Sequence, residues 1–367
     1  MEIGNKTISR QSNIELLRII AMFMVVAHHF VIHGGFDFST ETVSANRLWV
    51  QFLQSGGKLG VDIFVLISGY FLIESEFKLS KLLKLWLQMF TYSMTLYLIF
   101  IIWGEQSLNI GGLLKCLFPI TSSYWWFAST YFMMYLLSPY INKFLRTLEQ
   151  ETYQRLLILL TFCWCIIPTF LSEAWQCNDL LWFIYLYAVA GYFRIYVPQR
   201  KVKGRVYLMS ALALSVAAFL LIVILDFIGT RFAFVGTHAL SFTDMQRLPV
   251  PIIAYLMFAG FEKIDIAPNR AINVIASATF GVYLIHDDPN VRQYIWKTLF
   301  KNAAFAESDF LIPYSIAVIV LVYIVCTVIE LIRIYFIEKY YIKAVDKISV
   351  IVIGWAKNIA IRDKEMK

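Results

Sequence analysis

Apolar runs about 20 residues long are the feature that most constrains this chain, because a helix of that length crosses the hydrocarbon core of a bilayer. Hydrophobic residues make up 59% of the 367 residues and charged residues 16%. One globular core cannot bury that much apolar surface. We therefore predict an all-α, polytopic membrane helix bundle with about ten transmembrane helices. Their expected bounds are 14–33, 53–73, 83–103, 124–141, 156–171, 180–197, 206–228, 248–261, 271–287 and 310–332.

Lysine and arginine lie mainly on one side of these spans. If the N-terminus is cytoplasmic, about three quarters of the 32 Lys and Arg residues fall on the cytoplasmic side, the excess expected for inner loops. We therefore expect both termini to be cytoplasmic. The net charge of +7 then reflects contact with anionic headgroups of the lipid bilayer. Nucleic acid is not expected as a partner, because the basic residues are spread over many short loops.

The chain divides into a membrane-embedded domain over residues 1–332 and a basic cytoplasmic tail over 333–367. The tail mixes charged and apolar residues and is a candidate for a helix on the inner membrane surface. No loop between the predicted spans is long enough for a separate enzyme domain, and no internal repeat is found. Run 14–33 is too long for a cleavable signal peptide, so we expect it to remain as the first span. Any chemistry must then occur among the helices or at their mouths.

The first predicted span carries five ionisable side chains, although charged groups in lipid are costly and usually face the bundle interior or water. Arg18 and His29 are 11 residues apart, so they share one helix face at a separation of about 16 Å. Glu15 lies one turn from Arg18, and His33 lies one turn beyond His29. His28 lies on a different face. The pattern favours a functional polar stripe; the alternative is an ion pair at one helix end and hydrogen-bonded histidines at the other.

The second span contains "GGKLGVDIFVLISGYFL" from Gly56 to Leu72. Asp62 is expected inside the outer mouth, near His29 if the two helices are neighbours. A carboxylate bonded to one imidazole nitrogen fixes the tautomer and raises the basicity of the other nitrogen. The alternative roles for Asp62 are pairing with Lys58, one turn away, or capping the helix start.

Further polar and aromatic residues lie near the expected outer face. In "HDDPNVR", His286, Asp287 and Arg292 are candidates for gripping sugar hydroxyls, or the segment is a helix stop with turn chemistry. Trp126 either stacks on a sugar or belongs to an interfacial aromatic belt. The five cysteines match no zinc or redox spacing, so we interpret them as packing residues and expect no metal.

These residues resemble the acyltransferase-3 family of bacterial membrane proteins. "ELLRIIAMFMVVAHH" is similar to its first-helix signature, with Glu15, Arg18 and His29 at the matching positions, although aspartate is more common at the first. "GVDIFVLISGYFL" is similar to its second-helix pattern and includes Ser68 and Tyr70. "YWWFASTYFMMYLLSPYI" resembles its tryptophan-led fourth helix, and "FGVYLIHDDP" its late segment with Tyr283 and His286. The third helix departs from the family, because "FKLSKLLKLWLQMF" lacks the arginine and proline often found there.

The resemblance implies a membrane-embedded O-acyltransferase of the bacterial plasma membrane. It would move an acyl group, often acetyl, from cytoplasmic acyl-CoA to a hydroxyl of a surface polysaccharide, a lipid-linked saccharide or another envelope acceptor. His29 would then act as general base, Asp62 would orient it, and Arg18 would bind an anionic part of the donor or hold Glu15. Additional candidates for donor binding are Lys78, Lys81, Lys84, Ser68 and Tyr70.

Three other classes of membrane protein stay open from the sequence. A transporter or flippase of lipid-linked saccharides would suit the intramembrane charges, but many such folds show repeats. A glycan polymerase would be expected to have a large outer loop. A non-catalytic sensor could use the same scaffold, but it would not require the pair of Arg18 and His29.

Overall fold

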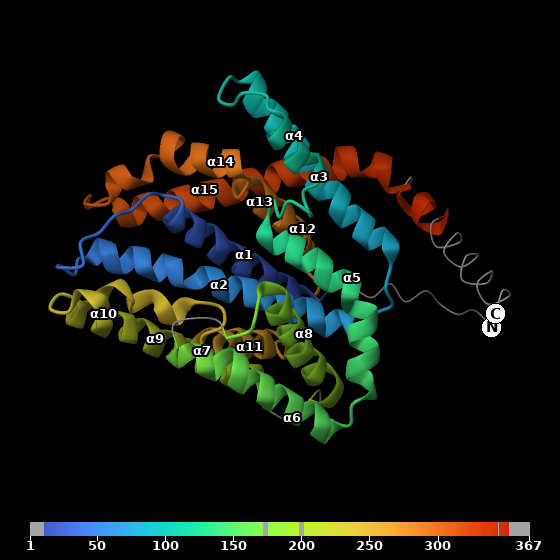
Figure 1. Ribbon diagram of the computed structural model, residues 1–367, viewed down its shortest axis with the longest axis horizontal. Coiled ribbons are helices and arrows are strands. Elements are labelled where there is room, and N and C mark those ends of the chain that lie inside the picture. The colour runs from blue at the N-terminus through green and yellow to red at the C-terminus, as the bar shows by residue number, and fades with distance from the viewer. Residues whose placement is uncertain (1–10, 172–174, 198–201, 344, 352–367) are drawn as a thin grey trace.

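The computed structural model describes residues 11–171, 175–197, 202–343 and 345–351. All regular structure in these residues is helical, and short π- or 3₁₀-helical turns, labelled η, follow or link several α-helices. In chain order the elements are α1 (Ser12–Ile32), α2 (Ala45–Leu72), α3 (Leu79–Ile102), α4 (Ile110–Leu117), α5 (Trp126–Thr147), α6 (Gln150–Thr161), η1 (Phe162–Ile166), α7 (Ile167–Phe170), α8 (Asp179–Tyr196), α9 (Gly204–Gly229), α10 (Ala233–Thr237), η2 (Ala239–Thr243), α11 (Pro249–Glu262), α12 (Arg270–Ser277), α13 (Thr279–His286), α14 (Pro289–Gln293), η3 (Tyr294–Leu299), η4 (Asn302–Phe305), α15 (Leu311–Ile332) and η5 (Arg333–Glu338) (Figure 1).

Each predicted span coincides with a helix, which confirms the all-helical architecture. The predicted span at 271–287 is two short helices, α12 and α13, because the chain bends at Ala278. Six of the described helices are long and apolar enough to cross a membrane, namely α1, α2, α3, the helix from Gln150 to Phe170, α9 and the helix that begins at Leu311. The number of ten spans and the cytoplasmic placement of the termini stay predictions.

The helix of α15 continues without a break into η5. Arg333, at the start of the predicted tail, is buried and pairs with Glu330 at 2.8 Å and with Glu338 at 2.9 Å. Glu330 also accepts hydrogen bonds from Gln88 and Tyr92 of α3, so the beginning of the tail is joined through this charge cluster to a neighbouring helix. The rest of the predicted tail beyond residue 351 and the basic residues Lys6 and Arg10 lie outside the described residues.

Helices α1 and α2 run side by side through the middle of the molecule and form its most extensive helix–helix contact (Figure 1). Glycines on α2 make this close approach possible. A Cβ atom at Gly60 would lie 2.6 Å from the backbone oxygen of Ala21, and one at Gly57 would lie 2.1 Å from Cγ of His28. In membranes the hydrophobic effect does not drive helices together, so small residues that allow close packing are common at helix interfaces.

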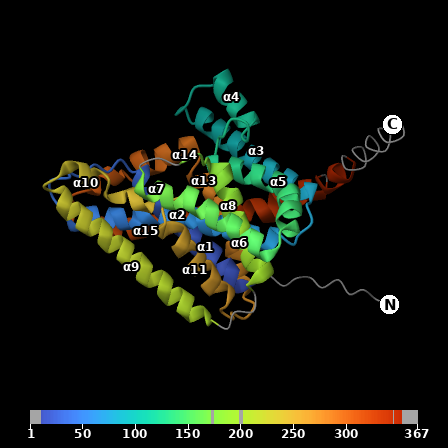
Figure 2. The same cartoon turned by 60° about the horizontal axis from the view of Figure 1, so that its bottom comes forward.

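A different face of α2 packs against α8, where a Cβ atom at Gly69 would lie 2.8 Å from Cα of Tyr187. Helix α9 lies at the outer edge of the molecule, against α11 (Figure 2). Its exposed side chains are large and apolar, among them Leu212, Leu220 and Ile224. A helix that is apolar on its exposed face suits contact with lipid.

The contact between α1 and α2 generates the first prediction. Gly60→Ala places a methyl group against a backbone carbonyl that cannot move without shifting α1, and we expect a loss of about 1–3 kcal/mol in stability. The measurement is thermal unfolding of the purified protein in lipid or detergent. Gly111→Ala in α4 is the control, because its nearest atom, Oδ1 of Asn109, is 3.6 Å from the added Cβ. Equal melting temperatures for wild type and Gly60→Ala would contradict this account of the interface.

Candidate active site

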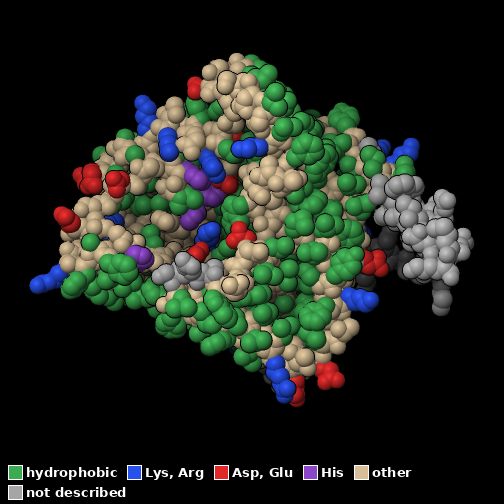
Figure 3. All heavy atoms as spheres, viewed as in Figure 1, with side chains coloured by type: hydrophobic (Ala, Val, Ile, Leu, Met, Phe, Trp, Pro, Cys, Tyr) green, Lys and Arg blue, Asp and Glu red, His purple; other side chains and the backbone are tan. Residues whose placement is uncertain are grey.

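Histidines from two distant parts of the chain meet at the end of α1. His29 lies in its last turns and is 7% exposed, and His286 ends α13 and is fully buried. Nδ1 of His29 lies 2.9 Å from Nε2 of His286. The space-filling view shows histidine side chains in a hollow with lysine and arginine side chains around it (Figure 3).

The hydrogen bonds of His286 determine which nitrogen of His29 carries a proton. Nδ1 of His286 lies 2.6 Å from the backbone oxygen of Val282, and a carbonyl only accepts, so this nitrogen must donate. In the neutral ring Nε2 of His286 is therefore an acceptor, and its partner, Nδ1 of His29, must donate to it. This leaves Nε2 of His29 with a free lone pair. The arrangement is that of a general base whose tautomer is fixed by a second imidazole.

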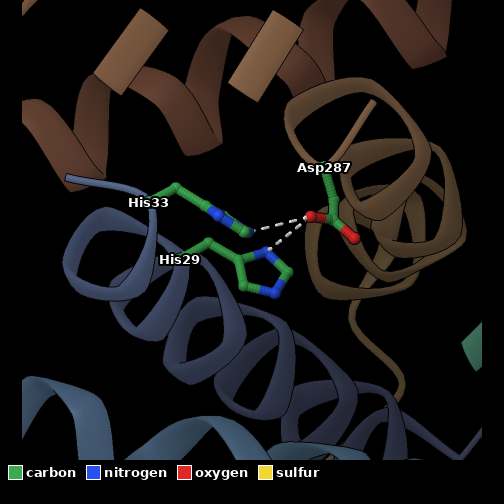
Figure 4. Close-up of side chains that lie close together, drawn as sticks. All are labelled: His29, His33 and Asp287. Carbon is green, nitrogen blue, oxygen red and sulfur yellow. Dashed lines mark ion pairs between the residues drawn. The ribbon is translucent and has the colours of Figure 1, made fainter. Parts of the chain in front are cut away.

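Asp287 supplies negative charge beside the imidazoles. Its carboxylate lies 3.7 Å from Nδ1 of His29 and 3.4 Å from Nε2 of His33 (Figure 4). It also lies 3.4 Å from the guanidinium of Arg292. The groups around this carboxylate are imidazoles, which can take up a proton, and a guanidinium, which is always charged. The carboxylate therefore stays ionised, and it stabilises positive charge on His29 whenever that ring takes up a proton.

The neighbouring Asp288 has a different role. Its side chain accepts hydrogen bonds from the backbone N–H groups of Asn290 and Val291 at the start of α14 and from the hydroxyl of Tyr124. Burial raises the pKa of Asp288 to about 6. The helix stop expected as one alternative for this segment is present, because α13 ends at His286 and Asp288 caps the start of α14, whereas Asp287 belongs to the histidine cluster.

His29, His33 and Asp287 lie close enough to hold a metal ion, because one ligand atom from each falls within 4.8 Å of the others. The nitrogen of His29 that faces Asp287 is Nδ1. That nitrogen already donates to His286, so it lacks the lone pair that a metal ion requires. The hydrogen-bond pattern thus favours an imidazole pair beside a carboxylate over a metal centre.

A pocket of about 70 Å³ opens next to His29. Lys58 is its one charged lining residue, and the ammonium group lies 4.6 Å from the centre of the Trp126 ring. Trp126, predicted from sequence as a possible sugar-stacking residue, is therefore in the pocket wall. The full lining is Met22, Val25, His28, His29, Ile32, Gly57, Lys58, Val61, Phe64, Trp126, Phe127 and Tyr283.

Asp62 is not the partner of His29, which corrects the expectation from sequence. Its Oδ1 accepts a hydrogen bond from Nε1 of Trp182 on α8 at 3.0 Å, in a fully buried position. The physical reason is helix rotation: Asp62 is five residues after Gly57, which turns it about 140° away from the face that meets α1. It shares its face with Gly69, which also packs on α8.

Ser68 and Tyr70 also lie away from the histidine cluster. The hydroxyl of Ser68 donates to the backbone oxygen of Phe64 within its own helix. The hydroxyl of Tyr70 accepts from Arg194 and donates to Glu262. Neither is in the pocket wall, so the structure brings neither to His29.

Arg18 lies on α1 with His29, as the helical spacing predicts, but it does not pair with Glu15 among the described residues. Its Nε atom is buried and has no hydrogen-bond partner there. The pocket at His29 extends along α1 to Met22 and does not include Arg18. The pocket therefore does not connect His29 with Arg18 in this structure.

The three lysines of α3 stand at the end of the bundle where α2 ends. Lys78 precedes the first turn and exchanges backbone hydrogen bonds with the hydroxyl of Tyr135. Lys78 and Lys81 are exposed and Lys84 is half-buried. They form no ion pair with the described residues, which leaves their charges free for an anion or for lipid headgroups.

A comparison with protein families identifies the chain. The acyltransferase-3 family model, described as an acyltransferase domain, matches residues 11–331. The chain belongs to the acyltransferase-3 family. The match covers α1 through nearly all of α15, so the family domain contains the whole histidine cluster and makes the chain a membrane acyltransferase in general terms. No curated protein and no solved structure matched the chain.

Sequence reasoning named most of the residues of this acyltransferase-3 site but missed two of their connections. His286 was expected to contact a sugar, and its bond to His29 joins residues 257 positions apart, which no local spacing reveals. Lys58 was considered only as a partner of Asp62. No local signal placed it in the pocket, because Lys58 lies two residues before Gly60 and about 160° around the helix from it.

The buried carboxyl of Asp288 gives a pH prediction. When a carboxyl group has a higher pKa in the folded state than in the unfolded state, the protein loses stability as the pH rises from the unfolded-state pKa to the folded-state pKa. From pH about 4 to about 6, wild type should therefore lose up to about 3 kcal/mol relative to Asp288→Asn. Melting temperatures measured across this pH range test the prediction.

Asp309→Asn, at an exposed position, controls for the loss of one carboxylate. A stability difference between wild type and Asp288→Asn that is constant with pH, or that grows in favour of wild type, would contradict the assignment.

Proposed function

We propose that this chain is a membrane O-acyltransferase that moves a short acyl group, acetyl, from acyl-CoA to a hydroxyl group of an envelope polysaccharide or another envelope acceptor. The observation that carries the proposal is the hydrogen bond between His29 and His286. It leaves one nitrogen free on a histidine that lines a small pocket inside a domain of the acyltransferase-3 family.

The proposed reaction begins with the acceptor hydroxyl in the pocket. Nε2 of His29 takes the hydroxyl proton while the acceptor oxygen bonds to the carbonyl carbon of the thioester. The resulting imidazolium keeps its bond to His286 and lies beside the Asp287 carboxylate. When the intermediate collapses, the carbon–sulfur bond breaks and the leaving thiolate takes the proton from Nε2. General-base assistance of this kind contributes about 10²–10⁴-fold.

The size of the pocket supports a small acyl group. A cavity of 150 Å³ in a protein interior holds benzene, which has six heavy atoms. The pocket at His29 is about 70 Å³, which suits the three heavy atoms of an acetyl group. Phe64 and Met22 form part of its apolar floor.

Arg18 supports an anionic donor. A guanidinium group binds phosphate oxygens in pairs, and the buried, unpartnered Nε of Arg18 fits such a ligand. With Arg18 at the cytoplasmic end, about 16 Å from His29 along α1, the donor phosphates would bind there and the thioester would reach the pocket. Met22, Val25 and Phe64 must move to admit it, because they line the pocket floor between the two positions.

The acceptor would enter from the outer end of the bundle. Trp126 offers an aromatic face and Lys58 and Arg292 offer positive charge near His29. These groups suit a saccharide, which is bound by stacking and by hydrogen bonds to its hydroxyls. A flippase would use the same charges, but the family match favours acyl transfer.

The proposal predicts that His29→Ala lowers acyl transfer by about 10²–10⁴-fold at an unchanged protein level. The measurement is acetylation of the envelope polysaccharide, by mass spectrometry, in cells that carry each variant. His238→Ala is the matched control, because His238 is an exposed histidine that contacts its own turn. Acetylation by His29→Ala at the wild-type level would refute the proposed function.

The role of His286 gives a second prediction for this reaction. His286→Leu removes the acceptor for Nδ1 of His29 and releases its tautomer, so we expect a loss of about 10²-fold or more in rate. His286→Gln keeps a side-chain oxygen that can accept the same proton and should retain more activity than the leucine variant. Comparable rates for His286→Leu and wild type would show that the imidazole pair does not serve catalysis.

A further inference from the structure

Acyl transfer requires a hydrogen-bond donor for the negative charge that develops on the carbonyl oxygen. Ser68 and Tyr70, the candidates from sequence, are held elsewhere by their own hydrogen bonds. The pocket wall must therefore supply this donor if the proposed function is correct. We propose that Tyr283 is that catalytic residue, donating its phenolic proton to the oxyanion.

The hydroxyl of Tyr283 is the first observation in favour. It is buried, and it makes no hydrogen bond of standard geometry with the described residues, although the Asp287 carboxylate and the Phe127 backbone lie near it. Buried polar atoms in folded proteins are nearly always paired, so an unpaired one requires an explanation. Among the residues that line the pocket at His29, Tyr283 is the one with such an atom. An oxyanion in the pocket would complete its hydrogen bonding.

The position of the ring is the second observation. Tyr283 is three residues before His286, so α13 presents both side chains on one face. The ring centre of Tyr283 lies 6.5 Å from that of His29. Because the pocket that they share holds only about 70 Å³, a carbonyl group within it is near both the base and the phenol.

Packing holds the phenol in place before the substrate arrives. Phe127 contacts the Tyr283 ring edge to face, with 5.5 Å between the ring centres. The ring centre of His286 lies 6.4 Å from that of Tyr283. The Tyr283 side chain is 3% exposed. A donor fixed in advance and removed from water stabilises a developing charge more strongly than a mobile, hydrated one.

The proposed step is balanced. The acceptor oxygen forms a bond to the carbonyl carbon, its proton passes to Nε2 of His29, and the carbonyl π electrons move to oxygen. The hydroxyl of Tyr283 donates a hydrogen bond to that oxygen and keeps its proton. Collapse restores the carbonyl, expels the thiolate and returns the hydroxyl to its unpaired state.

The test compares Tyr283→Phe with Tyr323→Phe. Tyr323, on α15, also has a buried hydroxyl without a partner, but its ring packs against Phe23 outside the pocket. The purified variants are assayed in lipid vesicles with acetyl-CoA and with envelope polysaccharide extracted from cells that lack the chain. Melting temperatures are measured on the same samples.

We expect Tyr283→Phe to lower kcat by about 10²–10³-fold with little change in KM for either substrate. Its melting temperature should equal or exceed that of wild type, because an unpaired buried hydroxyl is removed. Tyr323→Phe should keep the wild-type kcat. Loss of activity without loss of stability separates catalysis from a structural role.

Two outcomes would overturn this assignment while leaving the proposed function intact. One is a wild-type kcat for Tyr283→Phe, and the other is an equal loss in both variants, which would indicate a general packing effect. Absence of transfer by wild type under these conditions, with His29→Ala indistinguishable from it, would overturn the function and the role of Tyr283 together.

Discussion

The close approach of α1 and α2 is the contact on which the rest of the structure depends. Gly57 and Gly60 let α2 approach α1 closely. Gly57 lies against the His28 side chain, and Gly60 lies against the Ala21 backbone. This fixes which side of α1 faces α2 and so turns His29 and His33 toward α13. Without the glycines, α1 would be displaced or rotated, and the pairing with His286 and Asp287 would be lost.

Four buried ionisable groups near one another behave differently because each has different partners. His286 is held by its own backbone and accepts from His29. Asp287 is surrounded by imidazoles and a guanidinium and stays charged, and Asp288 caps a helix. In a low-dielectric site such fixed partners decide which atom is free to react. The free atom here is Nε2 of His29, whose side chain lines a pocket of the size of a small acyl group.

The positions of the helices follow from the sequence, because long apolar runs and helical periodicity are local signals. The shared face of Arg18, His29 and His33 follows from the same periodicity, and α1 is one continuous helix across all but the last of these. The ninth predicted span was wrong in detail, since the chain bends between α12 and α13. A bend of this kind depends on tertiary packing around short helices, which no hydropathy pattern encodes.

The partners within the site were less predictable. Adjacency of α1 and α2 suggested that Asp62 would meet His29, but the rotation of α2 directs it to Trp182. His286 lies far from His29 in sequence, and only the folded chain brings them together. That the pocket reaches Met22 and not Arg18 is likewise a property of side-chain packing. The resemblance to the family indicated which residues belong to the site, and the folded structure shows which of them contact one another.

The most direct test of the central claim is nitrogen NMR of the protein labelled with ¹⁵N-histidine in lipid. The chain has only five histidines, so the signals of His29 can be assigned from the spectrum of a His29→Ala variant. We predict that Nδ1 of His29 is protonated and Nε2 is not, at a pH where the ring is neutral. A proton on Nε2, with Nδ1 bare, would contradict the account, because the base would then face away from the pocket.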